Sequence, residues 1–161
     1  MLKQLKYFVI ISLTGIFTFI ITSCDPSKKY EKDEQEKIDN YLASSNLQFS
    51  HKSSGLYYYE ISPGTGEVPN LYDTIEVKYT GKLLDGTVFD ETKDNETFKF
   101  IFYVDPIIEG FNEGVSYMKE GGKSYFLIPS TIGYGNYGYL FPAYTPTLFE
   151  VELIRIGRIS K

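Results

Sequence analysis

Short runs of alternating apolar and polar residues, each closed by a turn rich in glycine or proline, recur between Gly55 and Ile156. Residues 74–81 alternate in this way, and Asp85-Gly86 then supplies a turn that leads the chain back through residues 87–89. A period of two is typical of a strand with one buried face, and Asp-Gly between two such runs is a hairpin signal. These patterns predict a hairpin within a sheet that is buried on one face.

Four further segments have strand character, and one has the signals of a helix. The additional strands are predicted at residues 55–61, 97–103, 123–128 and 148–156. Asp105-Pro106 opens the predicted helix of about residues 107–118, and Gly121-Gly122 ends it. The 15 Tyr and 12 Phe among 161 residues also favour strands. We therefore predict one α+β domain with four to six antiparallel strands and one crossing helix.

The first 23 residues have a different character. Lys3 and Lys6 precede an apolar run from residue 7 to residue 21, which is the charge order of an export signal. A transmembrane helix needs about 20 apolar residues, so an uncleaved anchor is the alternative that fits less well. The run ends in Ile21-Thr22-Ser23-Cys24, which resembles the lipobox of bacterial lipoproteins.

That resemblance implies that residues 1–23 are a lipoprotein signal peptide and that Cys24 carries the lipid. The protein would then be held on a membrane of the bacterial cell envelope, outside the cytoplasm; an incidental free thiol is the alternative. Residues 24–54 are expected to form a charged tether containing a short helix, because they are nearly all polar as far as Ile38. Without its signal the chain has 14 Lys and Arg against 21 Asp and Glu, a net charge of −7, which argues against nucleic acid as a partner.

The predicted core lacks the residues that a metal site or nucleophilic catalysis would require. His51 and Cys24 are the only histidine and cysteine, and both lie outside the predicted core, so zinc, Ser-His-Asp and Cys-His sites are excluded there. Residues 64–66 and 133–138 are rich in glycine but lack the spacing of phosphate-binding loops, and we interpret them as turns. No metal and no cofactor are expected, and His51 is predicted to be a solvated linker residue.

The hairpin lies within a longer motif. Residues 77–90, Val-Lys-Tyr-Thr-Gly-Lys-Leu-Leu-Asp-Gly-Thr-Val-Phe-Asp, resemble the signature of FKBP-type peptidyl-prolyl cis-trans isomerases. The similarity continues through Ile107-Ile108-Glu109-Gly110-Phe111 and through residues 148–153. It implies that residues 55–157 form a domain of this family, with an FKBP-like twisted antiparallel half-barrel sheet wrapped around one short helix. The lipobox makes the chain similar to the FKBP-type lipoproteins associated with gliding motility.

The resemblance also implies the residues of the site: each of them taken alone would suit core packing better, and only their joint occurrence at the family's positions favours a pocket. Phe111 would form the floor of an aromatic pocket, and the backbone N–H of Ile108 would bind a peptide carbonyl. Lys93 is a candidate ion partner for Asp90, since residues 91–95 contain no arginine. The implied catalytic residues are Tyr79, Phe89, Asp90 and Tyr134. The implied substrate-binding residues are Phe98, Phe100, Ile107, Ile108, Phe111 and Phe149.

The implied activity is isomerisation of X-Pro bonds in exported or envelope proteins. Rotation about this bond faces a barrier of ~18–20 kcal/mol, and an apolar pocket shaped to the twisted amide lowers it without any covalent step. The expected partners are proline-containing polypeptides, the membrane through the lipid anchor, and macrolide inhibitors; the expected state is a monomer. Two alternatives remain open: a noncatalytic chaperone that holds proline segments, and a structural lipoprotein of a surface machine.

Overall fold

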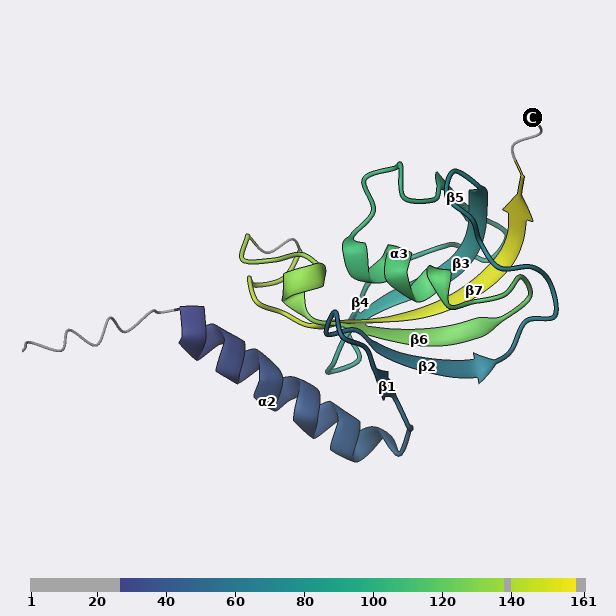
Figure 1. The fold of residues 1–161 in the computed structure, drawn as a ribbon. Coiled ribbons are helices and arrows are strands. Elements are labelled where there is room, and N and C mark those ends of the chain that lie inside the picture. Colours follow the sequence, from purple (N-terminus) through teal and green to yellow (C-terminus); the bar gives the residue numbers. More distant parts are fainter. Residues whose placement is uncertain (1–26, 138–139, 159–161) are drawn as a thin grey trace, which may run out of the picture.

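A computed structural model describes residues 27–137 and 140–158 of the chain (Figure 1). In this part of the protein, seven strands form one antiparallel sheet that is not closed, and helices α3 (Glu109–Ser116) and α2 (Ser27–Ser45) lie on its two sides (Figure 1). The strands are β1 (Ser50–His51), β2 (Tyr57–Ser62), β3 (Thr74–Leu83), β4 (Val88–Glu91), β5 (Phe98–Ile101), β6 (Lys123–Ile128) and β7 (Thr147–Gly157). A 3-10 turn, η2 (Ser130–Ile132), follows β6.

Two long neighbouring strands, β3 and β7, form the centre of the sheet. The strand order is β1-β2-β6-β7-β3-β4, and β5 also pairs with β3, beyond the end of β4. The predicted hairpin between β3 and β4 is confirmed: Gly86 has φ of +91°, and the Leu83 N–H donates to the Thr87 carbonyl at 2.8 Å. Glycine adopts this left-handed conformation without steric cost, which explains the Asp85-Gly86 turn.

The main core lies between α3 and the concave face of the sheet. Every second residue of the strands points to this side, as the period of two predicts. Phe126 of β6 is fully buried there, and a Cβ added to Gly114 of α3 would lie 2.6 Å from its ring. Glycine at that position therefore lets the helix approach the sheet closely. The buried residues of this cluster are Leu56, Tyr58, Ile75, Val77, Phe100, Phe102, Phe111, Val115, Met118, Phe126, Ile128, Phe149, Val151 and Leu153.

The segment expected to be a solvated tether with a short helix instead contains the 19-residue helix α2, which packs on the sheet. Ile38 is 1% exposed and joins a second cluster with Tyr57, Leu127 and Leu148 on the other face of the sheet. The charge of the segment concealed this packing, because only one side of the helix carries apolar residues. The folded unit therefore extends on the N-terminal side of residue 55.

The expectation for His51 was correct in one respect and wrong in another. Its side chain is exposed, as predicted for a linker residue. Its backbone, however, belongs to the two-residue strand β1, which pairs with β2, and its ring stacks on Tyr57 at a centroid distance of 4.3 Å. The stretch around His51 thus adds a strand to the edge of the sheet.

The predicted signal peptide of residues 1–23 and Cys24 lie outside the described residues. Within residues 27–137 and 140–158, no helix has the length and apolar character needed to cross a bilayer.

Candidate functional site

A cavity of about 230 Å³ opens between the concave face of the sheet and the N-terminal end of α3. Its volume is below the roughly 300–1,000 Å³ of pockets that enclose most of a drug-sized ligand, so it suits a single side chain with its adjoining peptide, or one part of a larger ligand. Aromatic and aliphatic side chains dominate its walls, and Asp90 is its one carboxylate. The lining residues are Tyr79, Asp90, Phe98, Pro106, Ile107, Ile108, Phe111, Tyr134 and Phe149.

The floor of the cavity is a set of aromatic rings that hold one another in place. Phe111, from α3, is 3% exposed, and its ring centroid lies 5.3 Å from that of Phe149 and 5.9 Å from that of Tyr79. Both contacts are edge-to-face, with interplanar angles of 82° and 78°. Aromatic pairs prefer such arrangements, which leaves the upper surface of the floor apolar and well ordered.

One side wall combines a strand with the loop that follows η2. Phe89 of β4 contacts Tyr134 edge-to-face at 6.0 Å and Phe149 at 5.6 Å. Phe141, which was not predicted as a site residue, packs behind Phe89 and Tyr134. Its ring centroid lies 4.9 Å from that of Phe89 and 5.2 Å from that of Tyr134. Phe141 therefore supports a wall to which the chain returns after the turns of residues 133–136.

The polar groups at the mouth of the cavity are Tyr79 and Asp90. The Tyr79 hydroxyl donates a hydrogen bond of 2.6 Å to the Asp90 carboxylate. Asp90 is exposed, and among the described residues no lysine or arginine forms an ion pair with it. The expected pairing with Lys93 is wrong: Thr92 bonds to the backbone of Tyr79, and the next residue, Lys93, lines a groove outside the cavity.

A backbone donor is available at the start of α3. Ile108 caps this helix in an extended conformation, and its carbonyl accepts from the N–H groups of Phe111 and Asn112. Within the described part of the chain, the N–H of Ile108 itself has no acceptor. An unused N–H beside an apolar cavity can bind the carbonyl of an entering peptide.

The structure brings eight of the ten residues predicted for the site to the wall of the cavity. The other two stand behind it: Phe89 supports Tyr134 and Phe149, and Phe100, 2% exposed, packs beneath Phe98 at 5.5 Å and Phe111 at 6.0 Å. Pro106 lines the cavity and was missed as a site residue, although Asp105-Pro106 was used to place the start of the helix.

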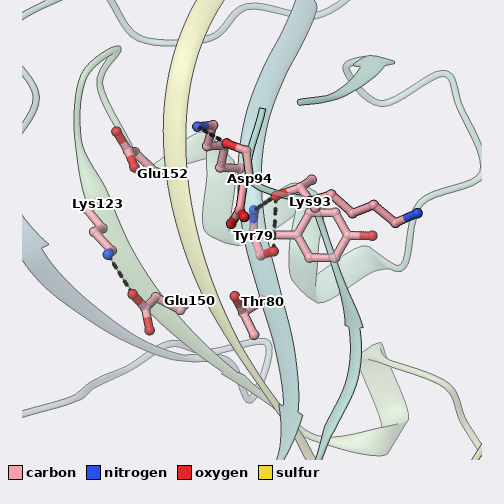
Figure 2. A pocket seen from close by; sticks show the side chains of 9 residues that line it. Tyr79, Thr80, Lys93, Asp94, Lys123, Glu150 and Glu152 are labelled. Carbon is pink, nitrogen blue, oxygen red and sulfur yellow. Dashed lines mark hydrogen bonds and ion pairs between the residues drawn. The ribbon is translucent and has the colours of Figure 1, made fainter. Parts of the chain in front are cut away.

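A second depression, on the outer face of the sheet, is polar (Figure 2). Two of its lysines already have partners: Lys123 forms an ion pair of 2.6 Å with Glu150, and Lys78 donates to the backbone carbonyl of Asp94 at 3.2 Å. Partial burial acts to raise the pKa of Glu150, but the hydrogen bond and charge of Lys123 outweigh it and keep this pKa below its usual value. Among the described residues, no group of three or more His, Cys, Asp or Glu is placed to hold a metal ion. The aromatic cavity is therefore the better candidate site.

Sequence comparison identifies residues 66–154 as an FKBP-type peptidyl-prolyl cis-trans isomerase domain. Similar proteins include the FKBP-type peptidyl-prolyl cis-trans isomerase FkpA of Aeromonas hydrophila, 39% identical over 136 residues that cover 81% of this chain and 50% of that protein. A probable FkpA of Neisseria meningitidis is 37% identical over 131 residues, covering 78% of this chain and 47% of that protein. The chain thus spans about half the length of the curated relatives it matches.

Solved structures agree with this assignment. A peptidyl-prolyl cis-trans isomerase from Pseudomonas syringae has a TM-score of 0.71 and 30% identity, covering 83% of this chain and 98% of that one. FkpA from Escherichia coli has a TM-score of 0.70 and 32% identity, and the match covers 81% of this chain and 64% of that one. The α+β fold expected from the resemblance, with an antiparallel sheet around one short helix, is confirmed. The chain belongs to the FKBP-type peptidyl-prolyl cis-trans isomerase family.

Proposed function

We propose that this protein catalyses cis–trans isomerisation of X-Pro bonds and that the aromatic cavity is its active site. The observation that carries the proposal is the combination of an apolar cavity the size of one residue with a free N–H at Ile108 and a hydrogen-bonded Tyr79–Asp90 pair at its mouth. Proline is the apolar residue whose preceding amide isomerises at an accessible cost. The site thus combines a place for the ring with groups that can orient the flanking peptide.

The reaction needs no nucleophile, only preferential binding of the twisted amide. A planar amide is stabilised by charge-separated resonance, and rotating it out of the plane costs ~18–20 kcal/mol. In an apolar enclosure the charge-separated planar form loses solvation, whereas the twisted form, with less charge separation, loses less. Binding the twisted form more tightly than either planar form then raises the rate.

Each group at the site has a role in this proposal. Phe111 and Phe149 grip the proline ring, Phe89 holds Phe149 and Tyr134 in place from behind the wall, and the Ile108 N–H donates to a carbonyl of the peptide. Tyr79, Asp90 and Tyr134 hold the amide or the flanking backbone. Phe98, Phe100 and Ile107 complete or support the substrate-binding wall.

Two substitutions test the activity, with a Leu-Pro or Phe-Pro peptide as substrate. Asp90→Val leaves the Tyr79 hydroxyl without the Asp90 acceptor, and its kcat/KM is expected to fall about tenfold, as for loss of a hydrogen bond to a charged group. Tyr134→Ala removes one aromatic wall of the cavity, and a loss of about the same size is expected. Tyr137→Ala is the control, because that side chain is 94% exposed. Cis–trans exchange measured by NMR gives the rates. Peptide binding without any acceleration by the wild-type protein would instead identify a noncatalytic binding module.

We further propose that the protein acts on exported or envelope polypeptides, as a monomer held on a membrane by a lipid on Cys24, and that macrolides compete for the same cavity. The support is the apolar run before Ile21-Thr22-Ser23-Cys24 and the acidic composition of the rest of the chain. Residues 1–23 would be removed, and residues 24–54 would connect the lipid to the catalytic domain of residues 55–157. Acyl chains contribute about 0.8 kcal/mol of membrane affinity per buried methylene. A protein that carries two or more acyl chains therefore stays bound to the membrane.

Replacing Cys24 tests the anchor. We expect Cys24→Ala to move the protein from the detergent phase to the aqueous phase in a phase-separation assay, because no thiol remains to be acylated. Asp25→Ala, which leaves the lipobox and the cysteine intact, is expected to stay in the detergent phase. A Cys24→Ala protein that partitions like the wild type would rule the lipid anchor out.

A further inference from the structure

A buried carboxylate on α2 binds the segment that leads to the cavity wall. Glu34 is 5% exposed and Ser130 is 2% exposed. One carboxylate oxygen of Glu34 accepts from the backbone N–H of Ser130 at 2.6 Å, and the other accepts from its hydroxyl at 2.7 Å. A buried carboxylate is costly unless such donors satisfy it, so these two bonds fix the distance between α2 and η2.

Ser130 depends on this contact for its own hydrogen bonds. It is the first residue of η2, and the preceding Pro129 supplies no side-chain hydrogen bond to the turn. The acceptor for the Ser130 N–H comes instead from a residue 96 positions earlier in the chain. Without Glu34, the N–H and the hydroxyl of Ser130 would lose their acceptor in a buried place.

From Ser130 the connection to the cavity is direct. The Ser130 carbonyl accepts from the N–H of Gly133 at 3.0 Å and from that of Gly135 at 2.8 Å. These two residues flank Tyr134, whose ring lines the cavity and contacts Phe89. Ser130 thus fixes the backbone on both sides of Tyr134.

A second contact from the same face of α2 reaches the same loop. Tyr30, one helical turn before Glu34, stacks on Tyr144 with a centroid distance of 5.0 Å and an interplanar angle of 7°. The Tyr144 N–H donates to the Gly135 carbonyl at 3.1 Å. Ile38, one turn after Glu34, anchors the helix on the sheet. In Figure 1, α2 and η2 lie on the same side of the molecule.

We propose that Glu34 is a positioning residue: through Ser130 it holds Tyr134 against the substrate, so that the helix next to the N-terminal segment sets the geometry of the active-site wall. This inference rests on the proposed isomerase function. Part of its test does not depend on catalysis, so the positioning role of Glu34 and the isomerase function can be overturned separately. Nothing in the geometry requires Glu34 to touch the peptide.

The test uses the full-length protein and three substitutions. Glu34→Ala removes both acceptors, Glu34→Gln keeps one acceptor and adds an amide donor for the Ser130 hydroxyl, and Glu36→Ala removes an exposed carboxylate from the same helix as a matched control. Amide hydrogen exchange at Gly133 and Gly135 reports the backbone around Tyr134. Exchange of the β3 and β7 amides reports whether the sheet remains folded.

In Glu34→Ala we expect faster exchange at Gly133 and Gly135, unchanged exchange in β3 and β7, and a kcat/KM about tenfold lower, since small misplacements of a binding group are costly. Glu34→Gln and Glu36→Ala should stay within about twofold of the wild type. In a Tyr134→Ala background, Glu34→Ala should cause no further loss, because the ring through which it acts is gone.

Several outcomes would overturn the inference. One is a Glu34→Ala protein with lower thermal stability but unchanged kcat/KM and unchanged exchange at Gly133 and Gly135. Another is an additive loss in the Tyr134→Ala background. If Glu34→Ala does not fold, Ser130→Ala, which removes only the hydroxyl, must show the same pattern at reduced size. If the wild-type protein has no isomerase activity, only the proposed function is overturned. Amide hydrogen exchange at Gly133 and Gly135 in Glu34→Ala then decides whether Glu34 positions the backbone around Tyr134.

Discussion

Replacing Phe126 by alanine is expected to lower the free energy of unfolding by about 3–5 kcal/mol, the range for deletion of a buried aromatic side chain. The Phe126 side chain is fully buried and packs against Tyr58 at 5.9 Å and Phe111 at 5.8 Å. Its ring also faces Gly114, so the substitution would open a cavity between α3 and the sheet. A loss of this size is a large part of the roughly 5–15 kcal/mol that stabilises an ordinary domain.

Urea unfolding followed by circular dichroism measures this effect. Tyr137→Ala is the matched control: it also deletes an aromatic ring, but one that is 94% exposed, and its effect is expected to stay within about 0.5 kcal/mol. Phe126→Leu provides a second variant in case the alanine protein does not fold. A loss below about 1 kcal/mol for Phe126→Ala would mean that α3 is not held on the sheet by this ring.

The parts of the fold that the sequence predicted are those with local and periodic signals. The hairpin between β3 and β4 was predictable because Asp85-Gly86 specifies its turn and the flanking residues alternate. The end of α3 was predicted two residues too late, at about residue 118, from the Gly121-Gly122 stop signal; the helix ends at Ser116, although Met118 is still buried. Burial continues there beyond the last helical residue.

The contacts that were missed join segments far apart in the sequence. Nothing near Glu34 indicates that its carboxylate is buried, since the partner Ser130 lies 96 residues away. Likewise, Phe141 lies beyond the turns of residues 133–136, and only the tertiary fold brings it to Phe89. For the site itself, the motif of residues 77–90 and the similarity that continues after it predicted which residues form the wall. They did not predict which of these side chains are exposed or which of them contact one another. Asp90 is an example: Lys93 was its candidate partner, whereas the carboxylate is exposed and accepts a hydrogen bond from Tyr79.

The second large effect is expected at Gly81, where the central strand passes between two rings of the site. A Cβ at this position would lie 2.8 Å from Phe89 and 2.9 Å from Phe149, closer than packed carbon atoms come. Gly81→Ala must therefore push these rings apart. Overpacking of this kind costs about 1–3 kcal/mol. Since Phe149 is proposed to grip the proline and Phe89 to hold Phe149 in place, we expect kcat/KM to fall as much as about a hundredfold.

Comparing stability with activity shows whether the rings of the site must keep their spacing for catalysis. Gly157→Ala is the control, because a Cβ there would lie 3.4 Å from Thr74, in ordinary contact, and far from the cavity in sequence and pairing. Peptide exchange rates and urea unfolding should be measured on both variants. If Gly81→Ala were destabilised but kept the wild-type kcat/KM, Phe89 and Phe149 could move without consequence, and the proposed grip of Phe149 on proline would have to be abandoned. If kcat/KM falls by far more than the loss in free energy of unfolding explains, the close spacing of Phe89 and Phe149 around Gly81 is part of the active site.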